Sequence, residues 1–242
     1  MARKILGVLA TGPSGNGKTT FFELLKGLVR PKHGEHIVGN IDMSSILIRW
    51  GMNQTSALGD ELRAHYHLIE EGRLIPDCLV VKTFKAWYAE VTMESDLQVL
   101  LLSGAPRSVE QLTIMDSFVN AMAISINATR EQSNASILER IRRSGRKLRV
   151  DDVGGKVVAD ERWSEYQLHT IPAIGKLNGN GLHLDRSEPL TARLRKTLEH
   201  MQARSGPIPL SMIQTGLNRL DAPEHPIHKR IYAVEHPVFA KD

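Results

Sequence analysis

A glycine-rich stretch near the start of the chain has the residue types and the spacing of a phosphate-binding loop. Residues 12–19 read Gly-Pro-Ser-Gly-Asn-Gly-Lys-Thr and match the pattern G-x-x-x-x-G-K-[ST]. In such a loop the backbone N–H groups point at an anion, and the N-terminus of the following helix adds partial positive charge. We expect Lys18 to reach the outer phosphates of a nucleoside triphosphate and the Thr19 hydroxyl to ligate Mg²⁺. The other residues expected to contact this nucleotide are Gly12, Pro13, Ser14, Gly15, Asn16, Gly17 and Thr20.

Such a loop needs a strand before it and a helix after it, and the sequence offers both. The apolar run 5–10 precedes the loop, and an amphipathic stretch begins at Phe21. Further β-rich runs at 36–40, 97–102, 122–127 and 181–184 alternate with helical stretches. This alternation predicts an α/β fold with a three-layer α/β/α arrangement around a parallel sheet, and it disfavours a glycine-rich turn without a ligand. Capping residues are expected at the starts of four helices: Asp42 or Ser44, Ser56, Asp77 and Ser108.

A second candidate for chemistry follows the run 97–102. The next residues are Ser103-Gly104-Ala105-Pro106-Arg107, a turn at the carboxyl edge of the predicted sheet, where ligands of such folds bind. This placement would put Arg107 beside the glycine-rich loop, where its guanidinium can form two hydrogen bonds to a phosphate. An isolated arginine at the start of a helix is more often simply solvated, so its assignment depends on the surrounding pattern.

In these residues the chain resembles the adenylate kinase family of nucleoside monophosphate kinases. The family signature Asp-Gly-Phe-Pro-Arg, followed four residues later by Gln, is matched in part by 103–107 and Gln111. Residues 43–49, Met-Ser-Ser-Ile-Leu-Ile-Arg, resemble the family's Ser-Thr-Gly-Asp-Leu-Leu-Arg, and 72–77, Gly-Arg-Leu-Ile-Pro-Asp, resemble its Gly-Lys-Leu-Val-Pro-Asp. Residues 149–152, together with Arg162 and Tyr166, resemble the Arg-x-Asp-Asp and Arg-x-x-x-Tyr that end the family's mobile lid and follow it. The resemblance runs over residues 4–200 or so.

The resemblance implies reversible transfer of the γ-phosphate of MgATP to a nucleoside monophosphate, with AMP as the expected acceptor. It implies that the catalytic charges are Lys18, Arg107, Arg143, Arg149 and Arg162, and that Arg140 lies over the donor base. The lid is about one residue shorter than in the family, and we prefer Arg143 over Arg146 for the remaining lid arginine. The residues implied at the acceptor site are Ser44, Arg49, Ile75, Gly104, Arg107 and Gln111.

The lid segment suggests anion binding by its charge alone. Residues 140–149 hold six basic side chains and no acid, so they repel one another unless an anion lies among them. Phosphoryl transfer needs in-line positioning and positive charge around the migrating group, which arginines and Mg²⁺ supply. A basic helix surface or an RNA contact is the alternative, but no aromatic residues alternate with these charges, which makes nucleic acid an unfavoured partner.

Three departures from the family pattern leave other functions open. Ser103 stands where the family has an acid near the magnesium waters, Ala105 replaces an aromatic residue, and Ser45 replaces a glycine. Selection of AMP then depends mainly on Gln111, whose amide offers adenine a donor and an acceptor. The alternatives are a kinase for UMP, CMP or a small alcohol, and a catalytically weak nucleotide sensor or RNA-associated protein.

Composition sets the broader expectations. Of the 242 residues, 41% are hydrophobic and 24% charged, the balance of a globular protein with a sizeable core, and the net charge is +4. Cys78 is the single cysteine, which excludes an internal disulfide framework and favours a reducing compartment. No apolar run approaches the roughly 18 residues of a membrane span, so we expect a cytoplasmic monomer. We expect one kinase domain over 1–204, with an acceptor-binding insertion near 43–91 and a lid near 143–155, and a proline-rich extension of unknown role over 205–242.

Overall fold

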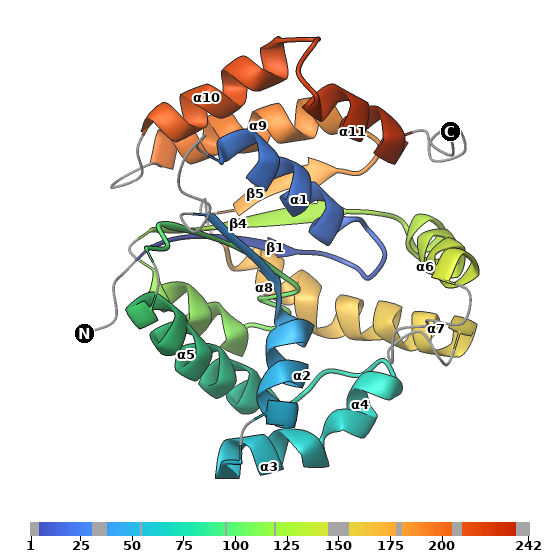
Figure 1. The fold of residues 1–242 in the computed structure, drawn as a ribbon. Helices are drawn as coiled ribbons and strands as arrows, with labels where there is room; N and C mark the ends of the chain where they lie inside the picture. Colours follow the sequence, from blue (N-terminus) through green and yellow to red (C-terminus); the bar gives the residue numbers. More distant parts are fainter. Residues whose placement is uncertain are drawn as a thin grey trace.

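A five-stranded parallel sheet forms the centre of the computed structural model, which describes residues 5–30, 38–53, 55–94, 96–118, 120–144, 155–177, 181–204 and 210–235. The strand order is β2-β3-β1-β4-β5 (Figure 1). The strands are β1 (Leu6–Thr11), β2 (Val38–Asp42), β3 (Val99–Ser103), β4 (Asn120–Asn127) and β5 (Gly181–Asp185). The α/β class and all five predicted strands are confirmed, with bounds that differ from the predicted ones by at most two residues.

One face of the sheet is covered by helices from the two ends of the chain. These are α1 (Lys18–Val29), α9 (Leu190–Arg204), α10 (Leu210–Asp221) and α11 (Ile227–Glu235), drawn above the sheet in Figure 1. Strand alternation sends Leu6 and Val8 of β1 into this layer, where they join Phe22 and Leu198 in one buried cluster. Because β1 and α1 are both anchored in this cluster, the loop between them is held at both ends.

The opposite face is covered by α2 (Met43–Asn53), α5 (Asp77–Glu94) and the 3₁₀ helix η1 (Glu110–Ser117). Leu9 of β1 points to this side and packs with an aromatic group formed by Phe84, Tyr88 and Phe118. A Cβ on Gly7 would lie 2.5 Å from the Phe118 ring, so only glycine lets this ring pack against β1. The short helices α3 (Ala57–Ala64) and α4 (Tyr66–Glu70) complete the predicted insertion.

Beyond the carboxyl edge of the sheet lie α6 (Arg130–Ser144) and α7 (Gly155–Glu165). The π-helical turn η3 (Tyr166–Thr170) and α8 (Ile171–Gly175) follow α7, and α8 lies below the sheet in Figure 1. The Asp160 carboxylate on α7 accepts from Arg130 of α6 at 2.8 Å and from Lys156 of its own helix at 2.7 Å. Hydrogen bonds from these two side chains lower the pKa of Asp160 well below its ordinary range. The pair between Arg130 and Asp160 thus joins the two helices that flank the predicted lid. The lid residues 145–154 lie outside the described ranges.

Two helices, α10 and α11, occupy most of the proline-rich extension, and the sequence reading did not predict them. Ile213 and Leu217 of α10 belong to the same buried cluster as α1. The Arg219 guanidinium also donates to the carbonyls of Leu28 and Arg30, each at 2.8 Å, where α1 ends. The described part of the extension is therefore part of the core. None of the helices in the described ranges combines the length and apolar character needed to span a bilayer.

Candidate functional site

The glycine-rich loop between β1 and α1 depends on backbone conformations that only glycine adopts readily. Gly12, Gly15 and Gly17 have φ values of 126°, 77° and 86°. A Cβ on Gly12 would lie 2.4 Å from the carbonyl oxygen of Ile126 on β4, so the loop also passes too close to its neighbour for any side chain. The loop therefore requires glycine at these positions.

The Lys18 ammonium is folded back onto the loop. Its Nζ donates to the carbonyl of Pro13 at 2.7 Å, to that of Gly12 at 2.9 Å and to Asn16 Oδ1 at 3.0 Å. The pKa of Lys18 falls from its ordinary 10.5 to about 7, first because of burial and then because of the charge of Arg107, while the charge of Asp42 opposes the fall. The ammonium is therefore held where an added anion would stabilise its charged form.

Arg107 is fixed at the carboxyl edge of β3 by hydrogen bonds of its backbone N–H, its backbone carbonyl and its side chain. Its N–H donates to Gln111 Oε1 at 2.8 Å, and its carbonyl accepts from the Thr170 hydroxyl at 2.9 Å. Its Nε donates to the carbonyl of Gly104 at 2.9 Å. Arg107 is also the charged residue with the largest effect on Lys18, so the two predicted anion-binding groups lie within electrostatic reach of each other.

The Gln111 amide, expected to recognise a base, is engaged at both ends by the protein. Its Oε1 accepts from the backbone N–H of Arg107, and its Nε2 donates to Asp77 Oδ1 at 2.7 Å. The residue is 2% exposed. Gln111 thus links Arg107 to the start of α5, and its amide keeps one N–H and one oxygen lone pair for a base. The predicted cap at Ser108 is confirmed, since its hydroxyl accepts from the Gln111 N–H at 3.2 Å.

A cavity of about 80 Å³ lies between the insertion, the β3 turn and α7. Five of the six predicted acceptor-site residues line it: Ser44, Ile75, Gly104, Arg107 and Gln111. Arg49 does not line this cavity; it is exposed on α2. Ser14 of the glycine-rich loop and Arg162 of α7 also form its wall, so it adjoins the loop directly.

The cavity is contracted, because α7 lies against the segment that follows α4. Gly72 has a φ of 80°, and a Cβ there would lie 2.8 Å from Val158 Cγ1. The N–H of Leu74 also donates to Glu165 Oε2 at 3.3 Å. Since ligand pockets for molecules of nucleotide size usually measure about 300 Å³ or more, these contacts must loosen for such a ligand to enter.

A larger hollow of about 1080 Å³ opens on the other side of the loop. Five predicted nucleotide-binding residues line it: Gly15, Asn16, Gly17, Thr20 and Arg140. Arg186, which directly follows β5, also lines it and was not singled out from the sequence; a basic residue at a carboxyl strand end was the available signal. Its guanidinium donates to the Gly15 carbonyl at 3.2 Å and to Ser136 Oγ at 2.6 Å, fastening the loop to α6.

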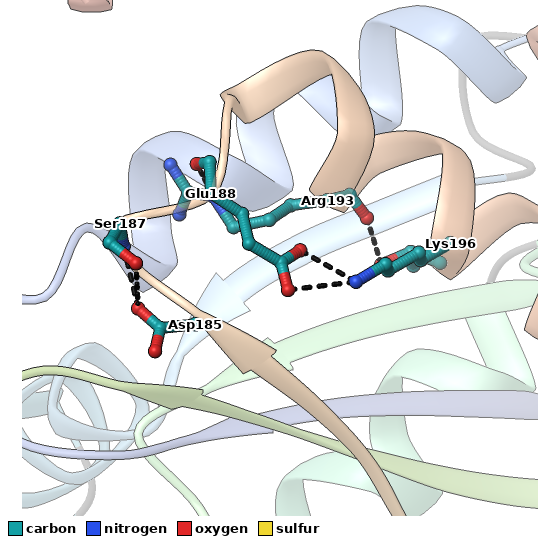
Figure 2. A network of polar contacts seen from close by, with 6 residues as sticks. Asp185, Ser187, Glu188, Arg193 and Lys196 are labelled. Atoms are coloured by element: carbon teal, nitrogen blue, oxygen red, sulfur yellow. Dashed lines mark hydrogen bonds and ion pairs between the residues drawn. The ribbon is translucent and has the colours of Figure 1, made fainter.

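The segment after β5 forms one rim of this hollow, and Figure 2 shows its polar contacts. Asp185 Oδ1 accepts from both the N–H and the hydroxyl of Ser187, each at 2.7 Å. The Glu188 carboxylate pairs with Lys196 of α9 at 2.8 Å, and the backbone carbonyl of Glu188 accepts from Arg193 Nε at 3.0 Å. The rim is thus fixed by its own hydrogen bonds before any ligand binds.

Asp42 lies at the carboxyl end of β2 and acts on the charge of Lys18. We call the charged residues around Lys18 the central site: Lys18, Asp42, Arg107, Arg140 and Arg162. Its Oδ2 accepts from the Ser103 hydroxyl at 2.8 Å, and its Oδ1 accepts from the N–H of Ser44 at 3.0 Å and from the Ser44 hydroxyl. Burial would raise the pKa of Asp42, but the hydrogen bonds from Ser44, the charge of Arg107 and the Ser103 bond together lower it. Asp42 therefore stays ionised, and of the two predicted caps for α2 it is the one that accepts a backbone N–H.

Two predicted lid residues cannot be placed in this geometry. Arg149 lies outside the described ranges, and so does the side chain of Arg143 in the last turn of α6. Arg162 is 8% exposed, and Arg140 and Arg162 both act on the charge of Lys18.

The predicted magnesium ligand Thr19 is exposed on the first turn of α1. The described residues contain no group of three or more His, Cys, Asp or Glu side chains able to hold a metal ion by themselves.

No protein-family model matches this chain, and no curated protein sequence matches it. The functional conclusion therefore depends on the chain's own geometry.

Proposed function

We propose that this protein is a P-loop nucleoside monophosphate kinase that transfers the γ-phosphate of MgATP to a monophosphate, with AMP as the expected acceptor. The observation that carries the proposal is the position of Arg107, which comes from the β3 turn and lines one cavity together with residues 12–14 of the glycine-rich loop. The charge of Arg107 also lowers the pKa of Lys18 in that loop. A hollow suited to a donor nucleotide lies on one side of this pair, and a cavity lined by predicted acceptor residues lies on the other. Two phosphates bound to these groups would face each other.

The charges around Lys18 fit this chemistry. Arg107, Arg140 and Arg162 each lower the pKa of Lys18, which means that each repels its ammonium, and the charge of Asp42 offsets part of this repulsion. In the reaction an acceptor phosphate oxygen forms a bond to the γ-phosphorus while the bond from that phosphorus to the β,γ-bridging oxygen breaks. The charge spread over the transferred group then attracts the same cations, so their repulsion is relieved in the transition state.

The residues at this edge also fit a magnesium ion bound with ATP. Magnesium prefers oxygen ligands and usually keeps several waters beside substrate phosphates. The Thr19 hydroxyl on the first turn of α1 and the ionised Asp42 at the end of β2 are oxygen groups of the required kind. The ion supplies positive charge to the β- and γ-phosphate oxygens when bound.

A second candidate, a kinase of this architecture for an acceptor other than AMP, is favoured by one observation. The Gln111 amide is already bonded to Arg107 and Asp77, so adenine would have to be recognised by the one N–H and the one lone pair that remain on a side chain only 2% exposed. The acceptor base would otherwise be selected by the shape of the cavity around Leu47, Ile69 and Ile75. UMP, CMP and small alcohols therefore belong in the substrate panel.

The test is a coupled assay for ADP formation from ATP with AMP, UMP, CMP, GMP and small alcohols, with and without Mg²⁺. We expect Mg²⁺-dependent turnover with a monophosphate, and loss of at least about 100-fold in kcat for Lys18→Met and Arg107→Met. Arg195→Met is the matched control, because Arg195 pairs with Asp221 on the far helices. Tight ATP binding without turnover on any acceptor would overturn the kinase proposal and favour a nucleotide sensor.

A further inference from the structure

The carboxylate of Asp42 stands among the cations of the central site. Lys18 is influenced by Arg107, Arg140 and Arg162, each of which lowers its pKa, and by Asp42, which raises it. Asp42 in turn is stabilised in its ionised form by the charge of Arg107. A partly buried acid beside these cations would repel ATP phosphates unless a metal ion accompanied them.

Strand register explains how Asp42 reaches this point. The last residues of β2 and β3, Asp42 and Ser103, are partners in the parallel ladder, and Ser103 is paired in turn with Ala10 of β1. The Ser103 hydroxyl holds Asp42 Oδ2 on the side of β2 that faces β1. A Cβ on Gly104 would lie 3.3 Å from Asp42 Oδ2 and 3.5 Å from Arg107 Nη2, so carboxylate and guanidinium share the space over this glycine.

Capping of α2 is the simplest alternative role for Asp42, and a second copy of the same local motif shows what capping leaves unexplained. Asp185 at the end of β5 accepts from the N–H and the hydroxyl of Ser187, as Asp42 does from Ser44 (Figure 2). Asp185 is exposed, whereas the second oxygen of Asp42 is bonded to Ser103 and acts on Lys18. The Asp-x-Ser turn therefore does not require the environment that Asp42 has.

We propose that Asp42 is the acidic positioning residue of the magnesium site: its carboxylate, held by Ser103 and Ser44, orients the waters of the ion that accompanies ATP. This inference rests on the proposed binding of MgATP. It assigns to β2 the negative charge that the neutral Ser103 of β3 does not supply.

Proton transfer is the other chemistry that a carboxylate can offer, and the proposed acceptor does not need it. A phosphate monoester has its second pKa near 6, so at neutral pH the attacking oxygen is already ionised. Hydrogen bonds from Ser44 and Ser103 and the charge of Arg107 also make Asp42 a weak base. Orientation of metal-bound water needs only the charge and the fixed direction of the carboxylate.

The test compares ATP binding with and without Mg²⁺, measured by calorimetry, in the wild-type protein and in Asp42→Asn. Asparagine keeps the capping oxygen and the side-chain shape but removes the charge. We expect the variant to bind metal-free ATP as tightly as the wild type or more tightly, because a negative charge facing the phosphates is gone. We expect the factor by which Mg²⁺ strengthens ATP binding to fall by about 10- to 100-fold.

Two further variants separate charge from fold. Asp221→Asn removes an exposed carboxylate that pairs with Arg195 on the far helices, and the magnesium factor should stay at the wild-type value. Asp42→Asn combined with Ser103→Asp returns the acid to the neighbouring strand and should recover most of the factor. Thermal unfolding of each variant confirms that it is folded under the conditions of the binding experiment.

Each result bears on a separate claim. An unchanged magnesium factor in Asp42→Asn, or equal weakening of ATP binding with and without metal, overturns the role of Asp42. Loss of phosphate transfer with an unchanged factor also overturns it, because the carboxylate would then act on the acceptor. If the wild type binds MgATP through Asp42 but phosphorylates no acceptor, the kinase proposal fails while the assignment of Asp42 stands.

Discussion

The buried charge of Lys18 should make the stability of this protein depend on pH in a way that a single substitution removes. The fall of the Lys18 pKa from 10.5 to about 7 corresponds to about 5 kcal/mol, at about 1.4 kcal/mol for each pH unit. The unfolded chain keeps this proton up to its ordinary pKa, whereas the folded chain releases it above about 7. The unfolded state therefore binds more protons between these values, and the free energy of unfolding rises with pH across this window.

Lys18→Met removes the titrating group, so the difference between wild type and variant isolates it from every other titration. Urea unfolding of both proteins between about pH 6 and about pH 9 should show the wild type gaining about 2.5 kcal/mol relative to the variant, which is the part of the linkage that falls in this range. Saturating ATP should reduce this gain, because phosphate charge raises the pKa of Lys18. A difference that stays constant with pH would refute the assignment of a buried, low-pKa ammonium to the loop.

Three other substitutions test the parts that surround the site. Gly72→Ala should lower the free energy of unfolding by about 2–4 kcal/mol in urea titrations, because alanine disfavours a positive φ and its Cβ meets Val158; Gly175→Ala, with open space around it, should stay within about 1 kcal/mol of wild type. Gln111→Glu should lower kcat/KM by a similar factor, about tenfold, for every acceptor if the amide supports Arg107, whereas a changed ratio between AMP and UMP would identify it as a base reader. Asp160→Asn should be less stable than wild type at neutral pH in thermal melts, and the difference should shrink as the pH falls below about 4. A lowered carboxyl pKa stabilises the folded state fully above the unfolded pKa, and this stability is lost as the pH falls towards the folded pKa. A difference in melting temperature that does not change with pH would contradict this ion-pair role.

The parts of this structure that the sequence predicts are those written in local patterns. The glycine-rich loop is defined by consecutive residues, and the five strands by short apolar runs between helical stretches. Parallel connectivity then brings the carboxyl ends of β1 and β3 to one edge, where the charge of Arg107 lowers the pKa of Lys18. Arg49 does not line the cavity, because the direction in which a helical residue points depends on how the whole insertion packs.

The parts that could not be predicted depend on partners far apart in sequence. From the sequence, Gln111 is predicted to contact a base. The structure shows that its amide also donates to Asp77, which lies 34 residues earlier in the chain. The helices α10 and α11 were obscured by the prolines of the extension, although Ile213 and Leu217 have helical spacing; their burial depends on α1 and α9. In both cases the local pattern was readable, and the missing information was which distant surface lay opposite.

Asp42 also could not be assigned from a local motif, because its position beside the β3 turn depends on the pairing of β2 with β3. Read position by position, the β3 turn has a neutral serine where an acid is expected, and the site looks short of one negative charge. Neighbouring parallel strands lie about 4.8 Å apart, a spacing that a carboxylate side chain and one hydroxyl can bridge. Because Asp42 and Ser103 are register partners joined by a 2.8 Å hydrogen bond, an acid on β2 can serve the space beside β3. The charge of such a site is therefore better counted along the sheet edge than along the motif, and the paired Asp42 and Ser103 variants measure whether the edge or the position decides metal use.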